Sequence, residues 1–292
     1  MIIKDYDFGV SKTGPMMNLY CIGDIHIGSP AFQEKAYDEL AYIAKHDPFA
    51  YFICPGDVTD DDRPTTRLLR RQMFNDRQEA LEQEDIQHLT WLDNYVVPRL
   101  NKLLKPARTL GLLDGDHYRV YSTGLTSVQY ICAKNKIPYL GSGQALMRLN
   151  FKYKNGGVST VKIHIHHGKG SGVTEQADII QLQKISYQWP GVHIFIRGHS
   201  HKPKFVPCPY YYDSKERPPQ VHMKEGFLVN AGSFRGGLIM NKTDYAEQNN
   251  YSPTSSRCPI LHFVGTKTMS NNGSFGIDLS ASLTKQLGCS GD

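Results

Sequence analysis

The sequence lacks both the cysteine spacing of a metal knuckle and any apolar run long enough to cross a membrane. Its six cysteines are scattered without a C-x-x-C pair, so structural disulfides and a cysteine-ligated zinc site are not expected. Charged residues such as Lys4 and Asp5 interrupt the first twenty positions, which excludes the apolar stretch of a secretory signal. We therefore expect a soluble, cytoplasmic protein with no membrane partner.

Internal repeats and low-complexity tracts are missing as well, and the charge imbalance is small. The 292 residues are 40% hydrophobic and 21% charged, which is typical of an ordinary globular protein with a sizeable core. The formal net charge of +5 favours an anionic partner without identifying one.

Short apolar runs alternate with helical patterns along the chain. We expect strands at 18–22, at 51–54, within 108–117 and at 192–196. Helices are expected over 31–45, opened by Ser29 and Pro30, then one or two between 64 and 104 with Pro98 as punctuation, and further helices at 125–136 and 174–187. This alternation predicts an α/β layered fold with mixed β-sheets.

The clearest local signal is a β-hairpin. Apolar and polar residues alternate from Met147 to Tyr153, Asn155-Gly156-Gly157 supplies a turn, and a second alternating run follows. The return strand ends at His166 and His167. We expect one domain over 1–268 with a helical insertion at about 61–106, and a weakly ordered polar tail over 269–292.

Acidic and imidazole side chains follow five of the expected strands. The pairs are Asp24 with His26, Asp57 with Asp60, Asp116 with His117, His166 with His167, and His199 with His201. A single Gly-Asp at a strand end is usually a turn, and His164 is best explained as the polar face of an edge strand. Turn chemistry does not require histidine, whereas metal binding does, and ligands collect at the carboxyl ends of strands in layered α/β proteins.

Carboxylates with several imidazoles and no thiolate suit Mn²⁺, Fe²⁺ or Zn²⁺. Seven or so ligands are too many for one tetrahedral ion. They fit two ions that lie ~3.5–4 Å from each other and share a bridging carboxylate.

The blocks Asp24-x-His26, Gly56-Asp57-x-x-Asp60, Gly115-Asp116-His117, His167-Gly168 and Gly198-His199-x-His201 occur in one order along the chain. In this order they resemble the calcineurin-like metallophosphoesterase superfamily, over about two thirds of the chain. The resemblance implies a four-layer αββα sandwich of mixed β-sheets with a dinuclear metal centre. Mn²⁺ is the preferred ion, with Fe, Zn, Ni and Mg as alternatives.

Carried over position by position, the resemblance implies two ligand sets. Asp24, His26 and His201 would bind the first metal. Asp116, His167 and His199 would bind the second, with Asp57 bridging. His166 competes with His167, which we prefer because it precedes the glycine and shares strand parity with Ile163 and Ile165.

The same resemblance implies the reaction. A metal-bridging hydroxide would attack phosphorus in line, and His117 would protonate or stabilise the departing oxygen, so that Asp57 and His117 are the expected catalytic residues. The family's third block carries Asn followed by His and an acidic residue, where this chain has Asp116, His117 and Tyr118. The additional carboxylate predicts tighter metal loading and slower turnover, because a less positive centre acidifies its water less.

The substrate leaves more than one interpretation open. Arg63 and Arg67 stand in a basic segment beside the site and could clamp phosphate, or could belong to a solvated helix balanced by Glu79, Glu82 and Glu84. Lys169 and Ser171 lie in a Gly-rich loop that could cradle phosphate or simply be flexible. We expect a phosphodiesterase or phosphatase acting on a small or nucleotide-like phosphoester. The alternatives are a metal-dependent nuclease on DNA or RNA and a low-activity scaffold of the same fold.

Overall fold

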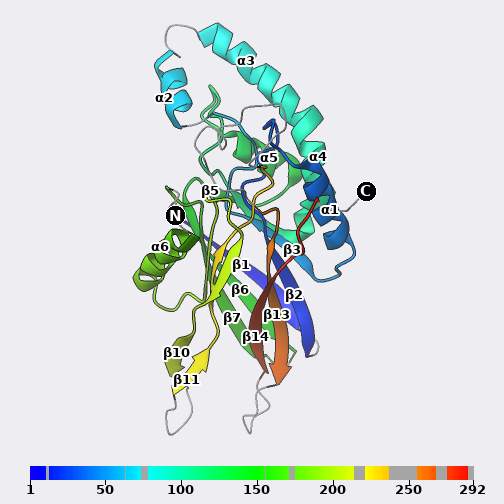
Figure 1. Ribbon diagram of the computed structural model, residues 1–292, viewed down its shortest axis with the longest axis vertical. Helices are drawn as coiled ribbons and strands as arrows, with labels where there is room; N and C mark the ends of the chain where they lie inside the picture. Colours follow the sequence, from blue (N-terminus) through cyan, green and yellow to red (C-terminus); the bar gives the residue numbers. More distant parts are fainter. Residues whose placement is uncertain are drawn as a thin grey trace.

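Two mixed β-sheets face each other in the centre of the protein, with helices on both outer sides (Figure 1). The computed structural model describes residues 1–10, 13–62, 64–73, 78–154, 156–170, 175–213, 221–236, 255–267 and 275–288. Within these ranges each of the two sheets has six strands. None of the described helices is long and apolar enough to span a membrane.

The first sheet has the strand order β1-β6-β7-β8-β12-β9. The predicted hairpin is confirmed, since β6 and β7 pair in antiparallel register with Gln144 opposite His166. The strands β7, β8 and β12 run parallel, so their carboxyl ends lie at one edge. The bounds are Ile2–Val10 for β1, Gln144–Tyr153 for β6, Val158–His166 for β7, Ile194–Arg197 for β8, Lys204–Pro207 for β9 and Phe227–Asn230 for β12.

The second sheet has the strand order β14-β13-β2-β3-β4-β5, in which β2 to β5 run parallel. Its bounds are Gly14–Cys21 for β2, Ala50–Cys54 for β3, Thr109–Leu113 for β4, Tyr139–Gly141 for β5, Pro259–Lys267 for β13 and Phe275–Leu283 for β14. A separate two-stranded ribbon of β10 (Tyr210–Asp213) and β11 (Val221–Lys224) projects beyond the sheets (Figure 1).

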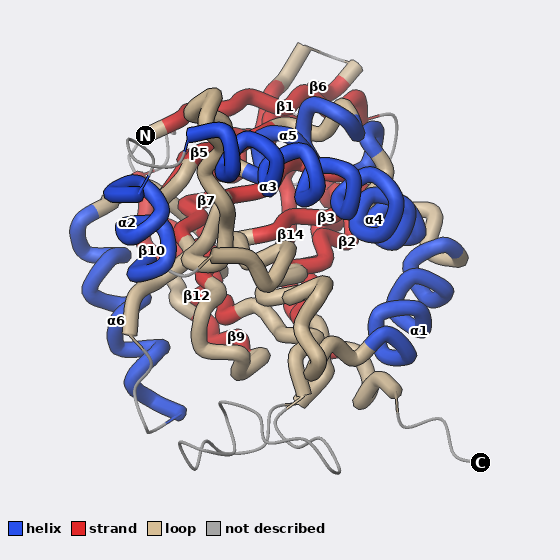
Figure 2. The backbone as a smooth tube through the Cα atoms, turned by 90° about the horizontal axis from the view of Figure 1, so that it is seen from above, coloured by secondary structure: helices blue, strands red, loops and turns tan. Residues whose placement is uncertain are grey.

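Three apolar clusters separate four layers, which confirms the αββα prediction. Between the sheets lie Leu19, Ile53, Met147 and Ile163. The helices α1 (Glu34–Lys45), α4 (Val97–Leu103) and α5 (Ser127–Asn135) cover the second sheet, whereas α6 (Glu175–Gln188) covers the first through Leu182. Figure 2 shows α6 and α1 on opposite sides of the strands.

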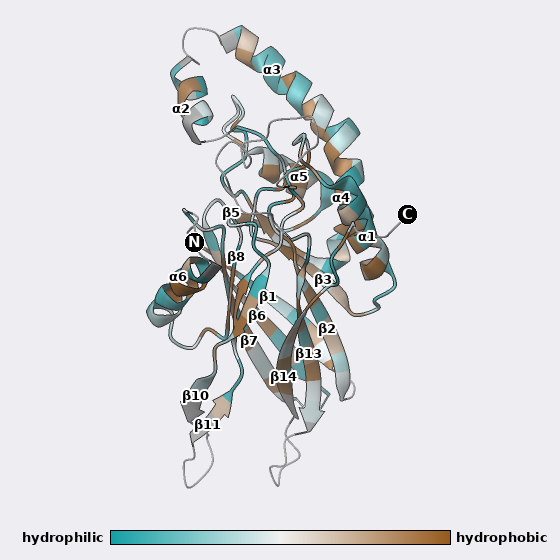
Figure 3. Ribbon diagram, viewed as in Figure 1, coloured by the Kyte–Doolittle hydropathy of each residue, from teal (hydrophilic) through white to brown (hydrophobic). Residues whose placement is uncertain are grey.

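The helical insertion is present and projects past the layers. It contains α2 (Pro64–Met73) and α3 (Gln78–Trp91), and α3 continues through a π-helical turn (Leu92–Val96) into α4. Pro98 does not interrupt this rod, because Val97 donates its N–H to Leu92 five residues back, and the wider turn accommodates the proline. Figure 3 shows that much of the projecting α3 is hydrophilic.

Three sequence-based expectations need correction. The helix expected from residue 31 begins at Glu34, because Ser29 uses its hydroxyl to accept the Ala31 N–H in a turn and Gln33 binds Phe234. The tail expected from residue 269 instead contains β14, an edge strand whose Ile277 is buried between the sheets. His164 is not on an edge strand, since β7 lies between β6 and β8, and its side chain is buried against Trp189.

Candidate metal centre

The carboxyl ends of five parallel strands bring the expected acidic and imidazole residues to one place. The strands β2, β3 and β4 contribute from the second sheet, and β7 and β8 contribute from the first. An isolated bridge between Ile22 and Gly232 joins the two sheets at this edge. The ligand atoms form close groups with the compositions Asp24-His26-His201, Asp116-His167-His199, Asp24-Asp57-His167 and His26-Asp60-His117.

Asp57 lies at the centre of these groups and is almost fully buried. Its Oδ2 is 3.3 Å from His167 Nε2 and 3.7 Å from His26 Nε2. Its Oδ1 accepts the backbone N–H groups of Asp116 at 2.6 Å and of His117 at 2.8 Å. One carboxylate therefore faces both ligand sets with one oxygen and fixes the neighbouring loop with the other.

The first set is held at the end of β2. His26 Nε2 lies 3.2 Å from His201 Nε2, and Asp24 Oδ1 is 3.7 Å from the same His201 nitrogen. His26 turns its Nδ1 towards Asp60, which leaves the Nε2 lone pair directed at His201. Two imidazole nitrogens at this distance repel each other unless a proton or a cation lies between them.

The second set is held by the loops after β4, β7 and β8. His199 Nδ1 is 3.2 Å from Asp116 Oδ2. His167 Nδ1 is 3.1 Å from the Pro55 carbonyl oxygen, an arrangement that requires the proton on Nδ1 and directs Nε2 into the site. That Nε2 is buried and has no hydrogen-bond partner among the described residues.

Backbone strain is concentrated in the same residues. Within the described ranges, six non-glycine residues have a positive φ, and five of them are the expected ligands Asp24, His26, Asp57, His199 and His201. Left-handed backbone costs such residues roughly 1–3 kcal/mol each and collects at functional sites. The strain indicates that the positions of these side chains, and not local stability, determined the loop conformations.

The ionisation of the site follows from burial and from the crowding of opposite charges. Burial alone would lower the pKa of His167, but Asp57, Asp24 and Asp116 raise it to about 9. Burial also opposes ionisation of Asp57, yet His167 and His26 hold its pKa well below the usual range. The pKa of Asp116 is lowered, first by its hydrogen bond with His199.

These observations fit a divalent cation at each ligand set. The donor atoms are carboxylate oxygens and imidazole nitrogens, and the described cysteines lie outside the groups. The neighbouring carboxylates favour a proton on His167, and a bound cation would take the place of that proton. The same cation would bind the buried nitrogen that makes no hydrogen bond. His167 belongs to these groups, whereas His166 faces the other side of β7, with its ring 5.6 Å from that of His164.

Several supporting residues were missed by sequence reasoning. Asp60 was noted but given no role, and its Oδ1 lies 3.2 Å from His26 Nδ1 and 2.9 Å from His117 Nδ1. Ser233 donates its hydroxyl to the Asp24 carbonyl, and Asn230 donates its amide to Ser200 Oγ and to the carbonyl of Lys202, which braces the loop of His199 and His201. For Asn230 and Ser233 the only sequence signal was their place after the apolar run 227–229.

The expected substrate contacts are placed unevenly. Arg67 Nη1 lies within hydrogen-bond distance of three backbone carbonyls, those of Asp62, Asp116 and Tyr118. Lys169 is exposed next to Gly168. Arg63 and Ser171 lie outside the described residues.

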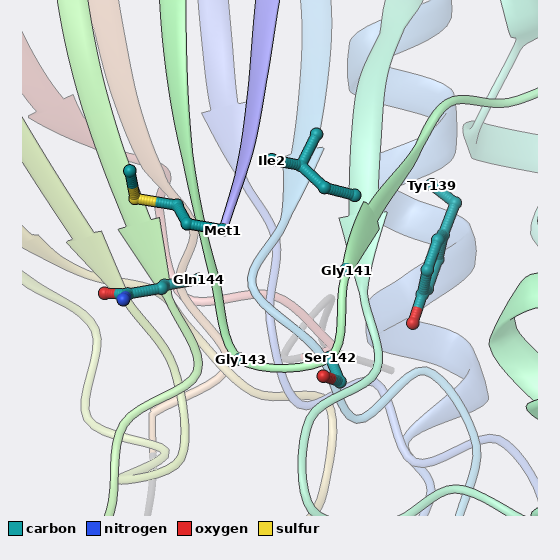
Figure 4. A pocket seen from close by; sticks show the side chains of 7 residues that line it. All are labelled: Met1, Ile2, Tyr139, Gly141, Ser142, Gly143 and Gln144. Carbon is teal, nitrogen blue, oxygen red and sulfur yellow. The ribbon is translucent and has the colours of Figure 1, made fainter.

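A pocket of about 430 Å³ lies beside β5 and the start of β6 (Figure 4). Apolar side chains of Met1 and Ile2, the Tyr139 ring, and the 141–144 loop line it. Gly143 O accepts the His167 N–H, and Gly141 O accepts the Asp114 N–H. The wall of this pocket is therefore bonded directly to two of the loops that carry the site.

No protein-family model and no curated protein matches the sequence. Among solved structures, the chain's fold is similar to that of the calcineurin-like phosphoesterase YfkN from Bacillus subtilis, with 10% identity and a TM-score of 0.39 over 92% of this chain and 90% of that one. A phosphoesterase predicted in Streptococcus pneumoniae is 10% identical with a TM-score of 0.34, over 91% of this chain and 98% of that one.

The NAD nucleotidase NadN from Haemophilus influenzae is 11% identical, with a TM-score of 0.37, over 94% of this chain and 50% of that one. At these TM-scores the fold class rests on the strand order, and the chemistry rests on the site's own geometry.

Proposed function

We propose that the protein is a two-metal phosphoester hydrolase acting on small or nucleotide-like phosphodiesters or phosphomonoesters. The observation that supports it most is that Asp57 Oδ2 lies 3.7 Å from His26 Nε2 and 3.3 Å from His167 Nε2, two nitrogens that belong to different Asp/His groups. A carboxylate within reach of two such groups is what a dinuclear centre requires.

We assign the first cation to Asp24, His26 and His201. Asp116, His167 and His199 would hold the second, and Asp57 would be shared between them. Mn²⁺ is the preferred ion because imidazole and carboxylate are mixed; Fe, Zn, Ni and Mg are alternatives. When bound, the cations supply charge that neutralises the phosphate oxygens and lowers the pKa of the attacking water.

The remaining steps belong to this chain's own residues. His117 is partly exposed, at 15% of its side chain, and its Nδ1 is 2.9 Å from Asp60. Asp60 orients the ring, so that His117 can deliver a proton to the departing oxygen. The pocket of Figure 4 offers an apolar wall of Ile2 and Tyr139 to the alcohol part of a substrate.

The nuclease alternative loses part of its support. Arg70 binds Glu84 and Asp85, and Arg67 binds backbone carbonyls, so two arginines of the basic segment are engaged within the protein. A phosphate clamp would require free guanidinium groups. We therefore place a small phosphoester ahead of nucleic acid.

The test is metal analysis followed by a substrate panel. The protein is stripped with a chelator, titrated with Mn²⁺, and assayed with a chromogenic phosphodiester, a phosphomonoester and single-stranded DNA. We expect two Mn²⁺ per chain and hydrolysis of a small ester that depends on the metal. A nuclease would instead cleave DNA with a steep salt dependence. Binding of two ions without turnover on any substrate would favour the scaffold, and failure to bind a second ion would overturn the proposal.

A further inference from the structure

Arg67 reaches from the helical insertion to the loop that carries Asp116 and His117. It lies in the middle of α2, and the residues it contacts at the end of β4 are 49 and 51 positions further along the chain. The distances from Nη1 are 2.7 Å to the Asp116 carbonyl oxygen and 3.0 Å to that of Tyr118. The guanidinium carbon also lies 3.8 Å from the centre of the Tyr118 ring.

The peptide group between Asp116 and His117 is held from both sides. Its carbonyl accepts from Arg67, and its N–H donates to Asp57 Oδ1 at 2.8 Å. A guanidinium and a carboxylate at opposite ends of one peptide polarise it in the same sense, so each strengthens the other's hydrogen bond. The orientation of this peptide determines where the side chains of Asp116 and His117 point.

We infer that Arg67 is a positioning residue that fixes the Asp116–His117 peptide against Asp57, and thereby sets the second metal group and the proton donor. The inference rests on the proposed function. It differs from both interpretations that the sequence left open, a phosphate clamp and a solvated helix, because Arg67 Nη1 donates to carbonyl groups of the protein itself. The first ligand set, Asp24 with His26 and His201, receives no contact from Arg67 within the described residues.

The decisive variants are Arg67→Ala and Arg67→Lys, with Arg70→Ala as the matched control. Arg70 lies on the same helix and loses ion pairs with Glu84, Asp85 and Asp62, none of which belongs to the loop after β4. Thermal unfolding of all three variants shows whether α2 remains docked. Mn²⁺ binding is then measured by calorimetry, without any substrate.

Arg67→Ala should bind the first Mn²⁺ as the parent does and the second about 10–100-fold more weakly, which is the usual cost of losing a residue that orients a metal ligand. Its kcat should fall at limiting Mn²⁺ while KM stays constant, and Arg67→Lys should recover part of the loss because it retains one charged donor. Arg70→Ala should behave as the parent. A substrate clamp would instead raise KM and leave both Mn²⁺ affinities unchanged, which would overturn the inference.

Hydrogen exchange at the His117 amide separates this inference from the proposed function. The amide should exchange faster in Arg67→Ala than in Arg70→Ala, even in the metal-free protein, because the peptide is no longer held at its carbonyl. Equal exchange in the two variants would overturn the positioning role. If the parent binds no second Mn²⁺ and the exchange still differs, the proposed function fails and the positioning role stands. If Arg67→Ala does not fold, Arg67→Lys decides through the same exchange and Mn²⁺ measurements.

Discussion

His117 places its Nδ1 2.9 Å from Oδ1 of Asp60, and the same oxygen lies 3.2 Å from His26 Nδ1. One carboxylate oxygen therefore orients an expected metal ligand and the expected proton donor together. Burial opposes the ionisation of Asp60, but the hydrogen bonds with His117 and His26 hold its pKa well below the usual range. Asp60 is thus a permanent anion beside both imidazole rings.

Asp60→Asn should lower kcat about 10–100-fold, because an amide that can also donate no longer fixes the ring orientation of His117 or the tautomer of His26. The loss should be larger for substrates with poor leaving groups, which depend most on protonation. Steady-state rates on a series of aryl phosphodiesters measure both effects. Asp93→Asn is the control, since Asp93 pairs at the surface with Lys134 and Tyr130. A variant with the parental rate would remove Asp60 from the mechanism.

Asp116→Asn tests the additional negative charge at the second set. Removing it should raise turnover on a chromogenic phosphodiester about threefold to tenfold, or ~1 kcal/mol in the barrier, since a more positive centre attracts phosphate and acidifies water more strongly. The same variant should release Mn²⁺ more readily. Calorimetric titration and initial rates measure the two changes. Lower turnover than the parent would show that the charge argument is wrong.

Much of the site could be found in the sequence because the signal is local. A Gly-Asp or Gly-His after an apolar run predicts both where the strand ends and which residue is a candidate metal ligand. Parallel strands bring such ends to one edge of a sheet. Parity along β7 separated His167 from His166 in the same way, since alternate side chains face opposite sides of a sheet. The long hairpin was clear because apolar and polar residues alternate from Met147 to Tyr153 and a turn sequence follows.

The missed features depend on partners that are distant in the sequence. Asp60 and Arg67 acquire their roles from loops roughly 50 residues away, and no spacing rule connects them. The alternation of Ile277 and Leu279 with Asp278 was present, but it is short and lies in a polar, Gly/Ser-rich segment. Its strand forms because β13 offers an edge and the core between the sheets takes up Ile277. The strand conformation of this segment depends on its pairing with β13 and not on its composition.

His167 and its neighbour His166 form a natural pair for testing ligand assignment. His167→Ala should lose the second Mn²⁺ and with it hydrolysis, because the variant lacks the nitrogen that groups with Asp116 and His199. His166→Ala should retain two Mn²⁺ per chain, since its ring faces away from the ligand groups. Metal analysis after gel filtration distinguishes the variants. If only His166→Ala lost metal, His166 and not His167 would be the ligand.

His164 should make the fold sensitive to acid. Burial lowers its pKa to about 4, well below the ordinary value of 6.5, so the unfolded chain takes up this proton first as the pH falls. Stability from His164 is complete above about pH 6.5 and is lost as the pH falls towards 4. His164→Asn should therefore lose less free energy of unfolding between pH 7.5 and 4.5 than the parent, by an amount on the order of 2 kcal/mol. Urea unfolding at the two pH values measures this difference. An unchanged difference would mean that His164 is protonated in the folded protein.

Alanine variants of Gly115 and Gly124 distinguish the cost of backbone strain from the effect of a steric clash at the site. Both have positive φ values, +84° and +81°, so alanine should cost each roughly 1–2 kcal/mol of stability. A Cβ at Gly124 meets nothing within 4 Å, whereas one at Gly115 would lie 2.4 Å from the Asp57 backbone nitrogen and still closer to Asp57 Oδ1.

Gly115→Ala must therefore displace Asp57, a carboxylate that faces both ligand sets. It should lose Mn²⁺ binding and hydrolysis together, whereas Gly124→Ala should retain both and show only a modestly lower unfolding midpoint. Calorimetric Mn²⁺ titration beside urea unfolding resolves the two effects. If Gly115→Ala still bound two Mn²⁺ with parental affinity, the close packing of the β3 and β4 loops around Asp57 could not be what builds the centre.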